Sequence, residues 1–193
     1  MPALLNDPNF WAAIAASGGA ISAIAALCAI WQSRMSARDA REAQRPYFLL
    51  EAPGIKPLPN APPFRVMITL KNSGARPATL LEGRIFMVPV STGATSTLDT
   101  TFSVGNPVPA NSPTPWYYDS LVLPTQCSPH YILLGIEYVD PLPSRRYRQA
   151  FFMRWDGVQN GTAQPDFVHV SVSEKAMLAK RFESIIGPYE GDG

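Results

Sequence analysis

The residues of this chain that could support metal or nucleophile chemistry are two cysteines and two histidines. Cys127 and His130 stand in Cys-Ser-Pro-His, which is the spacing of half a zinc site. A zinc site usually has four ligands, and the other histidine, His169, stands in the alternating run FVHVSV, which predicts a strand face. Cys127 and His130 could also form a nucleophile–base pair, but nothing in the pattern would orient the histidine. We therefore expect no metal and a structural role for both residues.

Motifs of the common enzyme classes are missing from the sequence. It contains no P-loop, no G-x-G-x-x-G, no H-E-x-x-H and no G-x-S-x-G. The acidic residues are scattered singly, so no carboxylate pair for general acid–base catalysis is indicated. We expect a protein that is not an enzyme, with no cofactor and no small-molecule substrate.

The composition narrows the class of protein further. Hydrophobic residues make up 46%, charged residues 16%, and the net charge is +1, which argues against a nucleic-acid binder. Aromatic residues make up 10%, which argues against disorder. Of the 20 prolines, 16 lie between Pro46 and Pro143, and this density excludes an all-helical bundle.

The N-terminal part of the chain has the pattern of a membrane-spanning helix. Between Asp7 and Arg34 lie 26 residues without a charge. Trp11 and Trp31 would lie about 30 Å apart along a helix, close to the hydrocarbon thickness of a bilayer, and tryptophan suits both membrane interfaces. The alternative is a buried helix of a soluble protein, which is rarely uncharged over seven turns. Because no Lys or Arg precedes the run, we expect an uncleaved anchor over residues 10–31, after a short external N-terminus, residues 1–9.

The segment that follows, residues 32–45, is rich in helix formers and stops before Pro46. Its four arginines are spaced by four, three and four residues, which places them on one helix face. They are Arg34, Arg38, Arg41 and Arg45. This face could contact anionic headgroups or an acidic partner, or it could be only the ordinary positive-inside signal. Because basic flanks stay in the cytoplasm, we expect a single-pass protein of the cell inner membrane with its N-terminus outside and its C-terminal domain cytoplasmic.

The span is unusually rich in small residues. Of the 21 residues from Trp11 to Trp31, 13 are Ala, Gly or Ser. Six of them form two small-xxx-small series: Ala15, Gly19 and Ala23, and Gly18, Ser22 and Ala26. Small residues let helices approach closely in lipid, so the series predict packing on a partner helix. The alternative is an alanine-rich anchor without a partner.

From Pro46 on, the hydrophobic period changes to two. Eight short runs rich in β-branched and aromatic residues alternate with Gly, Pro, Asn and Asp. They predict a mainly β fold, an antiparallel β-sandwich or barrel over residues 46–172. The clearest core strand holds Ile132, Leu134, Ile136 and Tyr138, and the next strand would face it with Tyr147, Phe151, Met153 and Trp155.

Two loops carry a resemblance to a known group of proteins. Asn72-Ser-Gly-Ala-Arg-Pro-Ala78 is an N-x-G-x-x-P-A turn, and YVDPLPSRRYRQ predicts a hairpin. Together with a span leading to Arg-Pro-Tyr, they resemble uncharacterised bacterial single-span membrane proteins with a cytosolic immunoglobulin-like β-sandwich. The resemblance implies this fold and placement, and no activity. We expect a positive φ at Gly74 and a fixed φ at Pro77; the proline-rich insertion 106–116 departs from the group and could be a contact surface.

The last segment, residues 173–193, predicts a short amphipathic helix and a tail. Ser171 and Glu174 fit a capping box, and Gly187-Pro188 fits a C-terminal stop. Leu178, Phe182 and Ile185 would share one face. This face could dock on the sandwich, on the membrane or in a partner's groove.

Taken together, these patterns favour a non-catalytic accessory or structural subunit of a larger membrane complex of respiratory, transport or light-harvesting type. Its partners would be integral membrane protein subunits and the lipid bilayer, with no nucleic acid. The alternative is a membrane-tethered binding or sensing module in a bacterial defence or signalling system.

Overall fold

The computed structural model describes residues 8–58, 63–91, 95–124, 126–160 and 162–186. The chain divides into two compact parts, Met1–Gln44 and Arg45–Gly193. The first part is the helix α1, Pro8–Ala43. Pro8 suits a first turn, where its missing N–H costs no hydrogen bond. The helix ends two residues short of the predicted end at Arg45, because Arg45 precedes Pro46 and is disfavoured in the α region. Residues 1–7 of the expected external segment lie outside the described residues.

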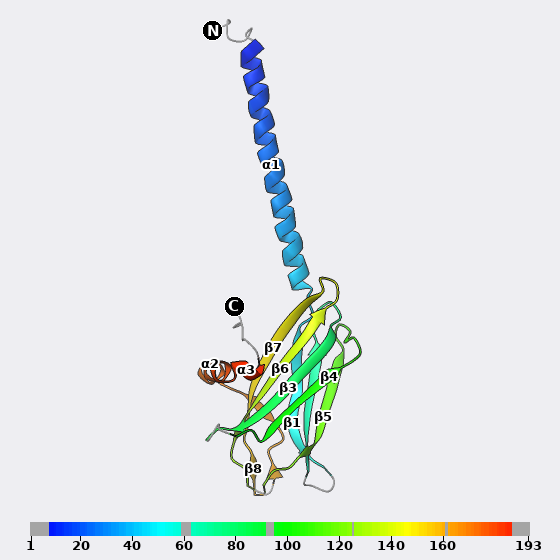
Figure 1. Ribbon diagram of the computed structural model, residues 1–193, viewed down its shortest axis with the longest axis vertical. Coiled ribbons are helices and arrows are strands. Elements are labelled where there is room, and N and C mark those ends of the chain that lie inside the picture. The colour runs from blue at the N-terminus through cyan, green and yellow to red at the C-terminus, as the bar shows by residue number, and fades with distance from the viewer. Residues whose placement is uncertain (1–7, 59–62, 92–94, 125, 161, 187–193) are drawn as a thin grey trace. The chain divides into compact units, whose positions relative to one another are not determined.

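The second part is built from antiparallel β-ladders (Figure 1). A three-stranded sheet has the order β1-β2-β5, and its strands are β1 (Phe48–Pro57), β2 (Phe64–Asn72) and β5 (Pro113–Leu121). A five-stranded sheet has the order β10-β7-β6-β3-β4, and its strands are β3 (Thr79–Pro89), β4 (Leu98–Val104), β6 (His130–Asp140), β7 (Arg145–Trp155) and β10 (Phe167–His169). The short strands β8 (Val158–Gln159) and β9 (Thr162–Ala163) pair with each other.

The inner faces of the two sheets share one buried hydrophobic cluster. Strand β2 alternates between buried and half-buried positions, with Val66, Ile68 and Leu70 at 1% exposure or less. The predicted core strand is confirmed: Ile132, Leu134, Ile136 and Tyr138 of β6 all lie in this cluster. Of the residues predicted to face them, Met153 and Trp155 are buried and Tyr147 and Phe151 are partly buried.

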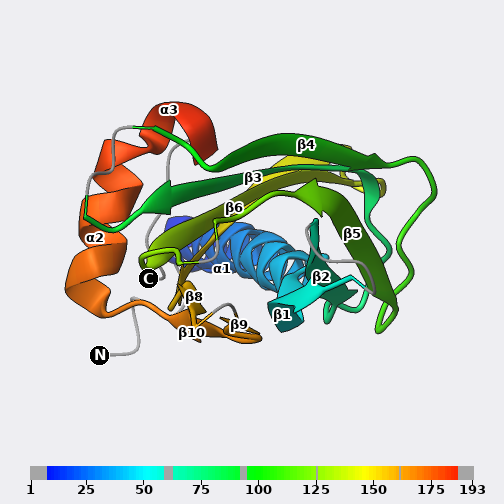
Figure 2. The same cartoon turned by 90° about the horizontal axis from the view of Figure 1, so that it is seen from below.

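The outer face of the five-stranded sheet is covered in part by two helices, α2 (Val172–Arg181) and α3 (Glu183–Ile186), which lie together at one side of the sheet in Figure 2. Leu178, Phe182 and Ile186 pack there against Phe86, Val88, Tyr131, Leu133 and Phe152. Strand β6 is therefore buried on both faces. Of the three sites open to the C-terminal helix, the sheet is the one it occupies.

The N-terminus of α2 confirms the predicted capping box. The Ser171 hydroxyl accepts a hydrogen bond from the Glu174 N–H, and the Glu174 carboxylate accepts one from the Ser171 N–H at 2.9 Å. The predicted stop at Gly187-Pro188 lies outside the described residues, and Ile185 is less buried than its neighbour Ile186.

Asn72 organises the N-x-G-x-x-P-A turn from a fully buried position. Its side-chain oxygen accepts hydrogen bonds from the Tyr47 and Gly74 N–H groups, at 3.3 and 3.1 Å. Its side-chain nitrogen donates to the Arg76 and Val108 carbonyls, at 2.8 and 3.2 Å. The whole amide is thus satisfied by backbone groups of three chain segments.

The reason for a glycine at position 74 differs from the one we predicted. Gly74 does not have a positive φ. Instead, a Cβ added there would lie 2.1 Å from the Arg45 carbonyl oxygen, so only glycine lets the chain pass this close. The proline-rich segment 106–116 is also tied down, because Val108 and Ala78 exchange two backbone hydrogen bonds. Pro113 and Pro115 lie on the edge strand β5, where proline is tolerated.

Candidate membrane and partner interface

Within the described residues, α1 is the one helix long and apolar enough to cross a membrane. None of its membrane-length window is buried inside the structure. Trp11 and Trp31 are 53% and 68% exposed, so neither indole is used to build a core of this chain. Length, apolar composition and exposure together are those of a candidate membrane span.

The predicted small-residue positions of α1 lie on one side of the helix. At 3.6 residues per turn, the six positions fall within about 140° of arc, with Ile21 and Ile24 on the opposite side. Gly18, Gly19, Ser22, Ala23 and Ala26 are exposed, while the side chain of Ala15 lies outside the described set. The Ser22 hydroxyl donates to the Gly18 carbonyl at 2.9 Å, which satisfies it without a partner and without water.

The two glycines of this face have no role in the described structure. A Cβ at Gly18 or Gly19 would meet nothing within 4 Å. Glycine in a helix interior costs about 1 kcal/mol relative to alanine, so the chain carries this cost at two adjacent positions without any packing of its own in return. The space that they leave is open to a neighbour.

Three of the four arginines that were predicted to share one helix face lie on α1, and Arg45 does not. Arg34, Arg38 and Arg41 lie exposed on α1, spaced by four and three residues. Arg45 lies beyond the end of the helix and belongs to the second compact part. There its guanidinium stands 5.4 Å from the ring centre of Tyr147, a cation–π contact.

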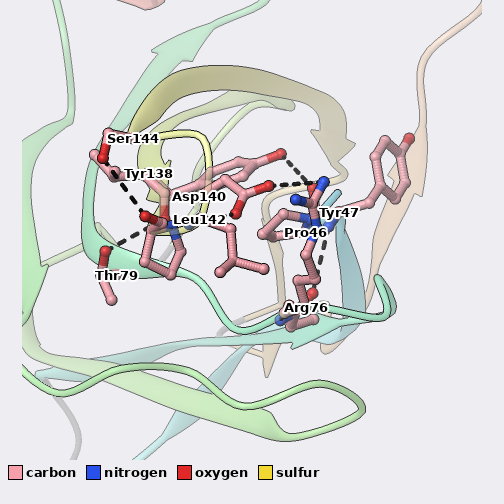
Figure 3. Close-up of polar contacts among 11 residues, drawn as sticks. Pro46, Tyr47, Arg76, Thr79, Tyr138, Asp140, Leu142 and Ser144 are labelled. Atoms are coloured by element: carbon pink, nitrogen blue, oxygen red, sulfur yellow. Dashed lines mark hydrogen bonds and ion pairs between the residues drawn. The ribbon is translucent and has the colours of Figure 1, made fainter. Parts of the chain in front are cut away.

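The chain enters the β-domain through a buried polar network (Figure 3). The Tyr138 hydroxyl donates to the Pro46 carbonyl at 3.0 Å, and burial raises the pKa of Tyr138. Asp140 is fully buried, and its Oδ2 lies 3.0 Å from Arg76 Nη2 in an ion pair. Asp140 Oδ1 accepts a hydrogen bond from the Leu142 N–H and holds the turn between β6 and β7. The two loops that carry the resemblance therefore meet at Pro46, the second residue of the β-domain part of the chain.

Cys127 and His130 lie side by side, and the contacts of their side chains are structural. His130 is 2% exposed, with Nδ1 2.7 Å from the Ser128 carbonyl and Nε2 2.8 Å from the Thr97 hydroxyl. Because a carbonyl only accepts, Nδ1 carries the proton and Nε2 accepts from Thr97. The Cys127 sulfur is 3.7 Å from Nδ1, and burial raises the pKa of its thiol, which is the opposite of thiolate activation. No group of three metal-ligating side chains occurs among the described residues, and His169 lies exposed on β10.

Sequence reasoning missed a basic groove of about 590 Å³ beside β7. One wall is formed by Tyr47, just before β1, and by Leu50 within it, and the other is β7 itself. Its basic lining residues are Arg45, Arg145, Arg146, Arg148, His169 and Lys175. The run SRRYR could be recognised in the sequence as part of a hairpin. That Arg45 and Lys175 line the same groove could not be predicted, because the fold brings these distant segments together.

A second groove of about 620 Å³ lies on the outer face of the five-stranded sheet beside α3. Three of its four charged lining residues, Arg84, Glu137 and Arg148, are ion-paired within the domain. Arg84 makes two hydrogen bonds to Asp99, at 2.8 and 2.7 Å, and Glu137 pairs with Arg148 and with Arg146. Pairing with Arg84 holds the pKa of Asp99 below its usual value. This groove is a balanced polar surface.

Comparison with known proteins does not identify a family. No protein family and no curated protein matches the sequence. Among solved structures, the chain is similar to one described as "X-ray structure of Northeast Structural Genomics Consortium target SoR45". The similarity covers 68% of this chain and 89% of that one, at 11% identity and a TM-score of 0.35.

Proposed function

We propose that the protein is a non-catalytic, single-pass accessory subunit that packs on and stabilises a larger membrane protein complex. The complex would be of respiratory, transport or light-harvesting type, and the partners would be its integral membrane subunits and the surrounding lipid. The observation that carries this proposal is the small-residue face of α1, where Gly18 and Gly19 leave open space that no part of the described chain fills. Close approach of helices across such faces allows the van der Waals packing that helps to drive helix association in lipid.

The β-domain would be the cytoplasmic part of this subunit, and we propose that it belongs to the immunoglobulin-like sandwiches of the bacterial group that the sequence resembles. Two antiparallel sheets around one core are compatible with this assignment. The arginines that follow the span, Arg34, Arg38 and Arg41, support a cytoplasmic C-terminal domain at the inner membrane.

Affinity purification from membranes in a mild detergent tests the proposal. Gly19→Leu and Ser22→Leu place bulk on the small-residue face and should reduce the recovery of the partner complex at least about tenfold, because separated backbones lose their packing. Ile21→Leu and Ile24→Leu are the matched controls on the opposite face and should retain the partner. Since leucine is more hydrophobic than glycine or serine, insertion of both variants into the membrane should be unchanged.

Equal recovery of a stoichiometric partner by the wild type and by both small-face variants would show that α1 is only an anchor. Purification of the wild type without any stoichiometric partner, under conditions that preserve known complexes of the same membrane, would overturn the subunit proposal altogether.

A further inference from the structure

We infer that one side of α1 binds an anionic phospholipid, with the lipid phosphate between Arg34 and Arg38 and an acyl chain along the apolar residues that precede them. This inference rests on the proposed function, because it takes α1 as a membrane span and its small-residue face as the side that holds the partner. It adds the chemical class of the lipid and the side of the helix on which the lipid lies.

The first observation is a row of side chains that changes from apolar to basic along the helix. Its members follow one another at spacings of three and four residues, and they are Ile24, Leu27, Trp31, Arg34 and Arg38. At 3.6 residues per turn they fall within about 80° of arc, so they line one side of the helix. All five are exposed. We call this row the graded stripe.

The second observation is the depth that each member would have in a bilayer. With Trp31 at the boundary of the hydrocarbon, Ile24 and Leu27 lie about 10.5 and 6 Å inside it. Arg34 lies about 4.5 Å beyond Trp31, within a polar layer of about 5–7 Å per leaflet. Arg38 lies about 10.5 Å beyond Trp31, and its long side chain can reach back to the same layer. The graded stripe therefore follows the order of acyl chain, ester and phosphate in one phospholipid.

The third observation is that the two guanidinium groups have no acidic partner among the residues that the structure describes. Neither Arg34 nor Arg38 takes part in an ion pair there. Glu42 lies one turn beyond Arg38, farther from the apolar segment, and does not pair with it. Like charges four residues apart on a helix repel each other, and a phosphate between them would remove this repulsion. Guanidinium groups also match the oxygens of a phosphate in geometry.

The position of the graded stripe around the helix favours lipid over an acidic protein as its ligand. The middle of the stripe lies about 130° from the middle of the small-residue face, so the two sides have different neighbours. A partner helix packed on Gly18 and Gly19 would leave the graded stripe turned towards lipid. Arg41, about 15 Å beyond Trp31, lies outside the polar layer and does not belong to the proposed site.

The experiment measures which lipid contacts Trp31 when the full-length protein is reconstituted in vesicles. All proteins carry Trp11→Phe, so that Trp31 is the one indole of the apolar segment, and Trp116 and Trp155 of the β-domain give a constant background. Lipids with brominated acyl chains quench an indole on contact. Brominated phosphatidylglycerol in phosphatidylcholine, and the reverse mixture, give the binding constant of the anionic lipid relative to the zwitterionic one. The anionic lipid should be preferred at least about fivefold, which is the contribution of one basic residue near a charged surface.

Variants of the Trp11→Phe protein test whether this preference belongs to the graded stripe. Arg34→Gln combined with Arg38→Gln should abolish it, because glutamine retains the helix and removes the charge. Arg41→Gln is the matched control, since it removes the same charge outside the polar layer, and it should change the preference less than about twofold. Gly19→Leu, on the small-residue face, should leave the preference unchanged.

Three results would overturn the inference. Equal quenching of the Trp11→Phe protein by the two lipids would show that the arginines select no anionic lipid, and loss of the partner complex from the Arg34→Gln, Arg38→Gln variant would then assign them to an acidic protein. An equal loss of preference in Arg41→Gln would reduce the site to the diffuse attraction of a positive flank. A preference retained in the double variant would place the anionic lipid elsewhere.

The lipid assay contains no partner, so its result does not depend on the recovery of a complex. A lipid preference together with unchanged partner recovery by Gly19→Leu would support the lipid site and count against the packing of α1 on a partner. The two proposals therefore fail separately.

Discussion

Gln149 on β7 holds the backbone of Phe48 on β1 through both ends of its side-chain amide. The Phe48 N–H donates to Oε1 at 2.9 Å, and Nε2 donates to the Phe48 carbonyl at 3.2 Å. Oε1 also lies 3.0 Å from the Tyr138 hydroxyl, whose one proton it shares with the Pro46 carbonyl. The amide therefore acts as the peptide group of a neighbouring strand would, and it joins the two sheets between β1 and β7.

Replacement of this glutamine should destabilise the β-domain. Gln149→Leu keeps a side chain of similar size but leaves the Phe48 N–H and carbonyl without their partner, and we expect a loss of about 1–3 kcal/mol in the free energy of unfolding. Denaturant unfolding of the full chain in detergent, followed by the fluorescence of the buried Trp155, measures the difference. Gln159→Leu, at an exposed position of β8, is the matched control and should change stability by less than about 0.5 kcal/mol. Equal stability of the two variants would contradict the role of the amide.

Asn72 offers a second stability test at the turn. Asn72→Asp replaces the amide donor that serves the Arg76 and Val108 carbonyls by an oxygen that repels them, in a fully buried site. We expect a loss of about 3 kcal/mol or more, since an uncompensated buried charge adds to the lost hydrogen bonds. Asn106→Asp makes the same chemical change at an exposed position and serves as the control. A hydrogen-exchange experiment should show the loss of protection concentrated in the turn and in residues 106–112, and unchanged protection there would count against this account.

The main features of the fold followed from patterns that are local in the sequence. Period-two alternation identified the β6 strand and its buried face, and the Ser171 capping box marked the start of α2. Other features depended on contacts between distant segments. The burial of Tyr131 and Leu133 on the second face of β6 arises only when α2 and α3 cover the sheet, so alternation alone missed it.

Of the candidate surfaces, too, one follows from a local pattern and the other from contacts between distant segments. The span and its small-residue positions could be read directly, because a helix converts spacing into a face. The basic groove could not, because it joins the start of β1 to β7 and α2, and Phe48 and Gln149 are 101 residues apart. The close approach at Gly74 also depends on the fold, because it brings the turn against the backbone of Arg45 and Pro46.

His130 predicts a pH dependence of stability. Burial lowers the pKa of His130 below its ordinary value, so the unfolded chain binds a proton more readily than the folded one. The stabilisation is therefore complete above a pH of about 6.5, the ordinary histidine value, and is lost as the pH falls from there towards the lowered pKa. Unfolding free energies measured between pH 8 and 5.5 should fall with pH in the wild type and in His169→Gln, whose side chain is exposed. In His130→Gln the slope in this window should be smaller, and an unchanged slope would exclude His130 as its source.

The arginine-flanked helix predicts the topology of the protein in the membrane. Arg34, Arg38 and Arg41 follow the apolar part of α1, and moving three guanidinium groups across a bilayer is costly. A reporter fused after Gly193 should therefore be active only if it functions in the cytoplasm, and protease added to intact spheroplasts should leave residues 46–193 uncut. Changing the three arginines to Glu and placing three Lys residues before Trp11 should invert the orientation and expose the domain to the protease. Digestion of the wild-type domain in intact spheroplasts would reverse the topology.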